Sequence, residues 1–110
     1  MSSQVIRVDG LRSLAAGSIS GTYTQIGTGF AHPMRIVKVV NNTNGDLTIS
    51  FDGVNDNDFV PANSFTLYDC TTNRVSSQYT FVFAKGTAIF VKGTPSTGSV
   101  YCVCIYGTGE

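Results

Sequence analysis

The sequence has no tryptophan, one histidine, one glutamate and few charged residues of either sign. Charged residues make up 13% of the 110-residue chain, against about 25% in an average soluble domain. Seven Lys+Arg balance seven Asp+Glu, so the net charge is zero. Without a basic excess to neutralise phosphates, a nucleic-acid partner is excluded. A hydrophobic content of 42% and seven Phe likewise exclude a disordered chain.

Long hydrophobic runs are also absent. The apolar stretches are only a few residues long, far short of the roughly 20 that a membrane-spanning helix needs, so no membrane partner is expected. The N-terminus lacks the apolar core and cleavage pattern of a secretory signal. The chain has an odd number of cysteines, Cys70, Cys102 and Cys104, without zinc-ligand spacing. We expect free buried thiols, a reducing cytosol and no cofactor.

Residues that favour strands are abundant. Twelve Val, seven Ile and 13 Thr stand against four Leu, and 12 Gly supply turns. No segment shows helical periodicity over a helix's length. The length suits one domain, and the short strands with regular turn signals predict an all-β fold, an antiparallel β-sandwich or jelly-roll-like barrel of about eight strands. Residues 18–110 are assigned to this domain, and residues 1–17 to an N-terminal arm or an edge strand.

Two strands stand out in the middle of the chain. Leu47, Ile49 and Phe51 alternate with polar residues, which predicts a strand over 46–52 with one buried face. The more apolar segment 34–41 predicts a central strand, and the Asn44-Gly45 pair between them predicts a hairpin. The last third is predicted to form a meander. The remaining predicted strands are 5–8, 18–26, 59–60, 65–68, 79–84, 88–92 and 99–106.

Residues for catalysis are scarce. The only histidine, His32, directly precedes Pro33 in a predicted loop, and no G-x-S-x-G nucleophile motif is present. Glycosidases use paired carboxylates, commonly including Glu, but the sole Glu is Glu110. The two Gly-Thr-Gly segments, at 27–29 and 107–109, lack the context of a phosphate loop and are interpreted as flexible connectors. The sequence therefore indicates that the protein is not an enzyme.

The densest polar cluster is the segment 52–58. Its carboxylates, Asp52, Asp56 and Asp58, are candidate calcium ligands. EF-hand spacing and a closing bidentate Glu are missing, and Asn and Asp are also typical of tight turns. The sequence therefore favours a plain turn over a cation site. The five tyrosines leave a stacking platform for sugars as another alternative.

Two stretches carry a resemblance to a known class of proteins. They are MRIVKVVNNTNGDLTISFDGVNDNDFVPANSFTLYDC, from Met34, and FAKGTAIFVKGTPSTGSVYCVCIYG, which ends at Gly107. Their turn and strand features resemble those of small all-β structural proteins encoded in the virion modules of tailed bacteriophages. The resemblance covers about two-thirds of the chain.

The resemblance implies a non-enzymatic virion component assembled in the bacterial cytoplasm. The leading hypothesis is a capsid decoration (cement) protein that binds the major capsid protein. A neck or tail accessory protein and, from another class, a carbohydrate-binding receptor module are the alternatives. The near-neutral surface also favours a homo-oligomer. Candidate interface residues lie in the N-terminal segment and two loops: Val5, Ile6, Val8, Leu11, Leu14, Asn55, Asn57, Thr94 and Pro95.

Overall fold

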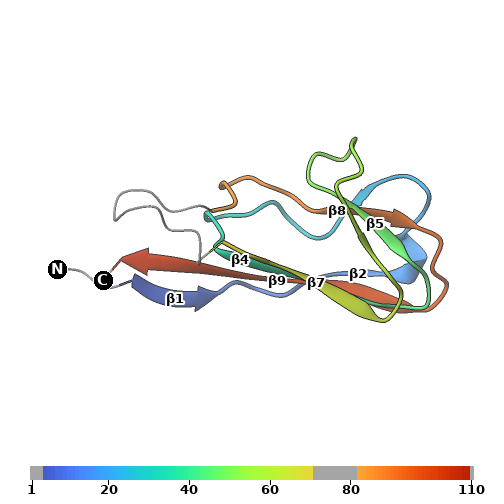
Figure 1. The fold of residues 1–110 in the computed structure, drawn as a ribbon, viewed down its shortest axis with the longest axis horizontal. Helices are drawn as coiled ribbons and strands as arrows, with labels where there is room; N and C mark the ends of the chain where they lie inside the picture. Colours follow the sequence, from blue (N-terminus) through green and yellow to red (C-terminus); the bar gives the residue numbers. More distant parts are fainter. Residues whose placement is uncertain (1–3, 71–81, 110) are drawn as a thin grey trace.

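Two antiparallel β-sheets packed face to face form the protein (Figure 1). The computed structural model describes residues 4–70 and 82–109. Within these ranges the only helical element is a single 3-10 turn, η1 (Ala16–Ser18). The predicted all-β sandwich is therefore confirmed, and the described residues contain nine strands where about eight were predicted.

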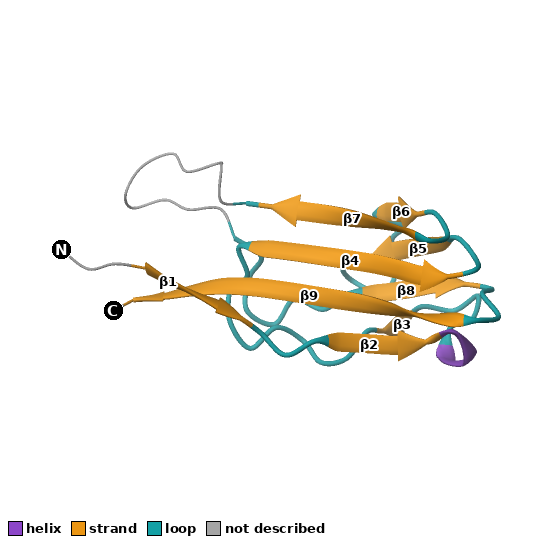
Figure 2. Ribbon diagram, turned by 90° about the horizontal axis from the view of Figure 1, so that it is seen from below, coloured by secondary structure: helices purple, strands orange, loops and turns teal. Residues whose placement is uncertain are grey.

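Sheet A has the strand order β1-β9-β4-β7, with β2 also paired to β9, and sheet B has the order β3-β8-β5-β6 (Figure 2). The strands of sheet A are β1 (Gln4–Val8), β2 (Arg12–Ala15), β4 (Ile36–Thr43), β7 (Ser64–Asp69) and β9 (Gly98–Gly109). Those of sheet B are β3 (Thr24–Gln25), β5 (Leu47–Ser50), β6 (Asp58–Val60) and β8 (Phe90–Gly93).

The connections between strands pass from one sheet to the other, with two exceptions. β5 and β6 form a hairpin within sheet B, and β1 and β2 follow each other along β9. When β1 and β2 are counted as one interrupted strand, each sheet has four strands, and the order is that of a jelly roll. All pairings are antiparallel.

The predicted hairpin at Asn44-Gly45 is wrong. β4 pairs with β7 and β9, and β5 lies in the other sheet. Neither Asn44 nor Gly45 has the positive φ that a type I′ hairpin turn requires. The buried Asn41 side chain forms the corner instead, because its amide nitrogen donates to the carbonyl oxygens of Gly45 and Val60, each over 2.9 Å.

The predicted meander in the last third is also wrong. β8 pairs with β3 and β5, whereas β9 pairs with β1, β2 and β4 in the opposite sheet. Of the predicted strand 79–84, residues 79–81 lie outside the described residues, and Phe83 forms an isolated bridge with Met34. The turn into β9 requires Gly98, whose φ is +90° and where a Cβ would lie 2.0 Å from the Asn42 carbonyl oxygen.

The N-terminal segment forms edge strands of sheet A. Val8 pairs with Ile105 and Arg12 with Cys102, so residues 9–11 oppose only residues 103–104. This extra residue is a β-bulge, which locally twists the edge. In the predicted strand 18–26, only Thr24–Gln25 is a strand, because the preceding chain crosses between the sheets.

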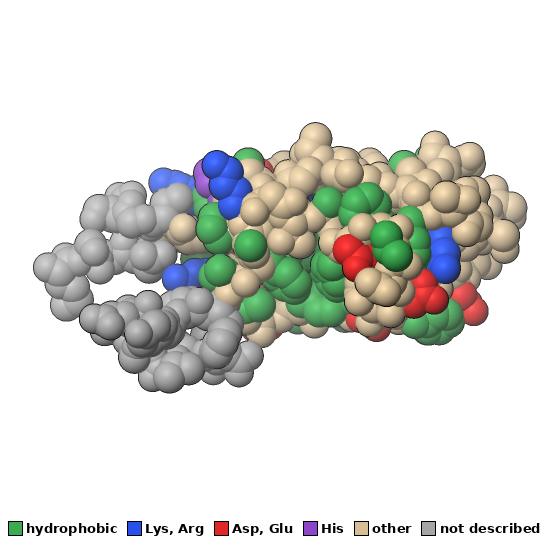
Figure 3. Space-filling model, turned by 90° about the horizontal axis from the view of Figure 1, so that it is seen from above, with side chains coloured by type: hydrophobic (Ala, Val, Ile, Leu, Met, Phe, Trp, Pro, Cys, Tyr) green, Lys and Arg blue, Asp and Glu red, His purple; other side chains and the backbone are tan. Residues whose placement is uncertain are grey.

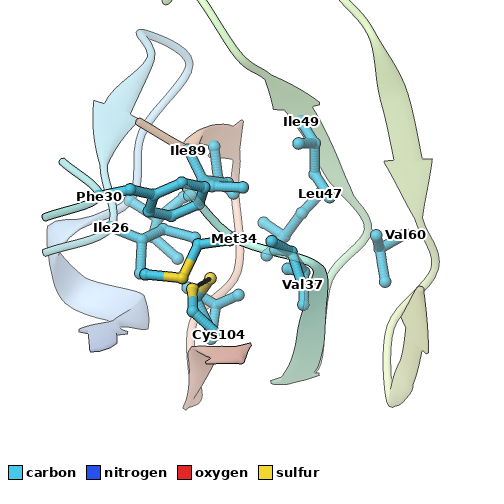
Figure 4. Close-up of a cluster of buried hydrophobic side chains, with 14 residues drawn as sticks. Ile26, Phe30, Met34, Val37, Leu47, Ile49, Val60, Ile89 and Cys104 are labelled. Carbon is cyan, nitrogen blue, oxygen red and sulfur yellow. Dashed lines mark hydrogen bonds between the residues drawn. The ribbon is translucent and has the colours of Figure 1, made fainter. Parts of the chain in front are cut away.

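The core lies between the two sheets and contains side chains from both (Figure 4). Leu47 and Ile49 are buried, as their alternation predicts, and β4 is central between β7 and β9. Cys102 and Cys104 are buried free thiols with their sulfurs 3.6 Å apart. Cys70 is also free but only half-buried, which differs from the expectation that all three are buried.

Candidate interaction surface

The solvent face of sheet A is largely apolar. The strand register aligns outward residues in rows across β7, β4 and β9. Val40 lies between Phe65 and Tyr101, and Lys38 lies between Leu67 and Val103. We define the sheet A outer face by its apolar outward residues, which are Ile6, Val8, Ile36, Val40, Phe65, Leu67, Tyr101, Val103 and Ile105.

Four of these side chains are strongly exposed. The exposed fractions are 60% for Ile6, 67% for Val8, 62% for Phe65 and 52% for Leu67. Lys38 is the one charged side chain at the outward positions of β4 and β9. Antiparallel sheets with one wet face normally alternate apolar-in and polar-out. The apolar outward residues therefore make this face the candidate interaction surface, although Asp69 is also exposed on it at the end of β7.

The opposite solvent face, on sheet B, carries both polar and apolar side chains. Thr48 and Lys92 are paired outward residues there, although the neighbouring Phe59 is also exposed. The neighbouring loop 51–57 contributes Val54, which is 78% exposed, and Figure 3 shows acidic side chains beside hydrophobic ones on this side of the molecule. The sheet B face therefore combines the Lys92–Asp56 ion pair with exposed apolar side chains.

Asp52 organises the loop 51–57 as a tight turn. Its Oδ1 accepts hydrogen bonds from the backbone N–H groups of Asn55 and Val54, both over 2.8 Å, and from the Ser50 hydroxyl over 2.7 Å. These bonds favour the ionised carboxylate, so the pKa of Asp52 lies well below its usual range, with the bond from Asn55 the largest cause. These hydrogen bonds hold Val54 and Asn55 close to Ser50, where β5 ends.

The other two candidate calcium ligands have separate protein partners. Asp56 accepts a hydrogen bond from the Tyr23 hydroxyl and an ion pair from Lys92 Nζ at 3.0 Å. Asp58 is bonded to the Tyr68 hydroxyl and lies on the opposite, inner side of sheet B beside Ile49. Among the described residues, no three His, Cys, Asp or Glu side chains gather as metal ligands. The structure therefore does not bring the three aspartates together.

The predicted interface residues fall into two groups. Ile6, Val8 and Leu11 are exposed, whereas Val5 and Leu14 are half-buried and Leu14 packs against the core. The N-terminal segment thus contributes one row of the sheet A outer face.

The predicted interface residues in the loops also make contacts that stabilise the fold. Asn55 donates to Asp52 Oδ2 over 2.6 Å, and Asn57 Oδ1 accepts from the Phe51 N–H over 2.8 Å. Thr94 is exposed, and Pro95 packs closely against Gly45. Both asparagines are exposed but already hold the loop shape.

Sequence reasoning missed the β4, β7 and β9 residues of the sheet A outer face. The signal was present: in β7, Phe65 and Leu67 alternate with Ser64, Thr66 and Tyr68. Alternation alone does not say which set faces the core, and here the apolar Phe65 and Leu67 face solvent. Likewise, the apolar run of β4 predicts a central strand, which it is, but does not show that its outward residues are only half-buried.

The remaining candidate residues have structural partners. His32 stacks on Tyr106 with ring centroids 4.0 Å apart. Tyr23 lies under Lys92 Nζ at 4.7 Å, and Tyr68 packs against Phe51 in the core. Tyr101 belongs to the sheet A outer face, and Tyr79 lies outside the described residues. The described tyrosines are therefore spread over different parts of the molecule.

Arg12 ties the N-terminal edge to the first Gly-Thr-Gly segment. Its guanidinium donates to the carbonyl oxygens of Thr28 over 2.9 Å and Gly29 over 3.3 Å, and pairs with Asp9 Oδ2 at 3.0 Å. It also lies 5.3 Å from the Phe30 ring centroid. Segment 27–29 is therefore held in place by Arg12 and is not the flexible connector that the sequence predicts. The shallow cleft of about 360 Å³ beside it is lined by Asp9 and Arg12, which already form an ion pair with each other.

The sequence matches no protein-family model, and no curated protein is significantly similar to it. Within the described ranges, no helix is both long and apolar enough to span a membrane. The geometry of the sheet A outer face is therefore the main structural guide to function.

Proposed function

We propose that this protein is a non-enzymatic structural subunit of a tailed-phage particle, a capsid decoration protein whose sheet A outer face binds the major capsid protein. The observation that carries the proposal is the set of apolar outward side chains on that face, with Val8 exposed on its β1 edge and Phe65 and Leu67 exposed on its β7 edge. The resemblance of residues 34–107 to virion proteins supports the choice of particle. Free thiols are compatible with assembly in a bacterial cytoplasm.

The exposed side chains set the strength of such binding. Covering a fully exposed aliphatic or aromatic side chain contributes about 1.5–3 kcal/mol, so the four that are 52–67% exposed would contribute roughly 4–7 kcal/mol together. Association itself costs at least about 4 kcal/mol. One copy on one isolated capsid subunit therefore binds weakly.

A repeated lattice changes this balance. If the protein contacts two or more neighbouring capsid subunits, the second contact benefits from a high effective concentration. Binding only to the assembled shell then stabilises the shell by mass action. This is the mechanism that a small, rigid and nearly uncharged sandwich is suited to perform.

A neck or tail accessory role is the alternative within the same class. It would use the same apolar face but require far fewer copies in each particle. A carbohydrate-binding role gains no support from the described tyrosines, which do not form a common platform.

Shells that lack this protein provide the test. Purified protein is added to them, and bound protein is measured by co-sedimentation. We expect wild-type binding, a loss of at least tenfold for Val8→Asp on the sheet A outer face, and retention for the matched Thr48→Asp on sheet B. No wild-type binding would refute the decoration role, and equal binding of both variants would refute the assigned face.

A further inference from the structure

The edge strands of the two sheets differ in how well they are protected against pairing. On sheet A, the β1–β2 edge is interrupted by the bulge at residues 9–11 and carries Arg7 and Arg12. On sheet B, β3 has two residues, and β6 has three and ends before Pro61. Bulges, short strands, proline and charge are the usual means of preventing edge pairing.

β7 has none of these protections within its first five residues. It is a regular six-residue strand with the sequence SFTLYD, and its one charge, Asp69, is at its end. It contains no Lys, Arg or Pro, and its register with β4 is continuous from Ser64 to Asp69. A regular edge strand with exposed apolar side chains is a template for another strand.

One hydrogen bond shows which N–H and C=O groups of β7 face β4 and which face the other side of the strand. The Cys70 N–H donates to the Arg35 carbonyl oxygen over 2.8 Å, which makes these residues a hydrogen-bonded pair. Such pairs alternate along an antiparallel ladder. The N–H and C=O groups of Thr66 and Tyr68 therefore point toward β4. Those of Phe65 and Leu67 point away from β4, to the side where no strand of the described residues pairs with β7.

We propose that β7 pairs antiparallel with β7 of a second copy of this chain across a two-fold axis at Thr66. In this register Phe65 of each chain lies opposite Leu67 of the other, which gives two apolar cross-strand pairs. The same two pairs exchange four backbone hydrogen bonds, because these are the residues whose polar groups point outward. Ser64 lies opposite Tyr68, and Asp69 lies opposite Asn63, so no like charges meet.

A second copy fits better than an unrelated strand because the edge is self-complementary in size and charge. The chain has no net charge to oppose its own association. Pairing would also join two copies of sheet A edge to edge, so that their apolar outer faces form one continuous surface across the dimer. The pairing goes beyond the virion role and does not depend on it, so each can fail without the other.

Sedimentation equilibrium of the full chain over a range of concentrations tests the pairing. We expect the wild type to reach twice 11.7 kDa, and Leu67→Lys to remain monomeric at concentrations at least tenfold higher. The matched control, Val103→Lys, places the same charge on the same face but away from the edge, and it should still dimerise. A monomeric wild type, or loss of dimer in both variants, which would indicate face-to-face packing, would overturn the proposal.

A cross-linking variant tests the register without weakening the edge. At the two-fold axis, Thr66 faces its own copy as a non-hydrogen-bonded pair, with Cα atoms about 4.5 Å apart, a distance that a disulfide can span. In a Cys70→Ser background, Thr66→Cys should form a covalent dimer on mild oxidation, and Ser64→Cys should not. Cross-linking of Ser64→Cys alone, or of neither, would contradict the proposed register.

Discussion

Replacing Asn41 by alanine should strongly destabilise the fold, because this side chain holds the corner where the chain leaves sheet A for sheet B. Asn41 is fully buried. Its amide nitrogen donates to the carbonyl oxygens of Gly45 and Val60 over 2.9 Å and Pro61 over 3.1 Å. Its Oδ1 accepts from the Thr43 N–H over 3.1 Å and from the Thr43 hydroxyl over 2.6 Å.

The size of the effect follows from these contacts. Asn has two amide hydrogens and one carbonyl oxygen, so the substitution removes the equivalent of about four hydrogen bonds, each with a net contribution of about 1 kcal/mol. The expected loss is about 3–4 kcal/mol, because the single Thr43 hydroxyl hydrogen, which lies within reach of both Asn41 Oδ1 and the Gly45 carbonyl oxygen, can still donate to Gly45. A domain of this size should melt lower by roughly 12–20 °C.

Urea unfolding and thermal melts followed by circular dichroism measure this loss. Asn42→Ala is the matched control, because Asn42 is the next residue of β4 and is exposed; it should change stability by less than about 0.5 kcal/mol. Asn41→Asp should be at least as harmful as Asn41→Ala, since its carboxylate would face three carbonyl oxygens. A loss below about 1 kcal/mol for Asn41→Ala would refute the account of the corner.

Further predictions concern buried and paired charges. Arg12→Ala should lower stability by about 2–4 kcal/mol in urea unfolding, because Asp9 and the carbonyl oxygens of residues 28 and 29 lose their donor; a change within 0.5 kcal/mol, as for a surface residue, would contradict this. The pKa of Asp52 is lowered on folding, so the stability that its ionised carboxylate contributes is complete above about pH 4 and is lost as the pH falls toward the folded-state pKa. Carboxyl NMR titration of Asp52 should give a midpoint below about 3.9. A normal midpoint would count against the hydrogen-bonded turn. Partial burial, the hydrogen bond to Asp56 and nearby negative charge raise the pKa of Tyr23 to about 12. The contribution of the Tyr23 hydroxyl to stability is therefore complete below about pH 10 and is lost as the pH rises toward 12. The ultraviolet titration of Tyr23→Phe should lack this late transition, and an unchanged titration would refute the assignment.

The sequence predicted the composition of the fold better than its connections. β-branched residues and alternation were sufficient for strands at β4, β5, β7 and β9, and for the inward position of Leu47 and Ile49. These are local properties that depend on the pleat of one strand. Which strands pair depends on contacts between distant segments, and the Asn44-Gly45 dipeptide is compatible with both a hairpin and a crossover between sheets.

The candidate surface was only partly predictable for a related reason. Exposed apolar residues near the N-terminus could be suspected because residues 1–17 had little patterning of their own. Phe65, Val40 and Val103 could not, because an apolar residue in a strand usually indicates the core. Only the register of β4 with β7 and β9 shows that these three side chains belong to an outward face.

The proposed function predicts that the protein is present in purified particles of a tailed phage, and its copy number in such particles tests the central claim most directly. Quantitative mass spectrometry, referenced to the major capsid protein, measures that number. A decoration protein that covers the shell should be present in hundreds of copies, and a dozen or fewer would indicate the neck or tail instead. Absence from purified particles would contradict the proposed role as a virion structural subunit.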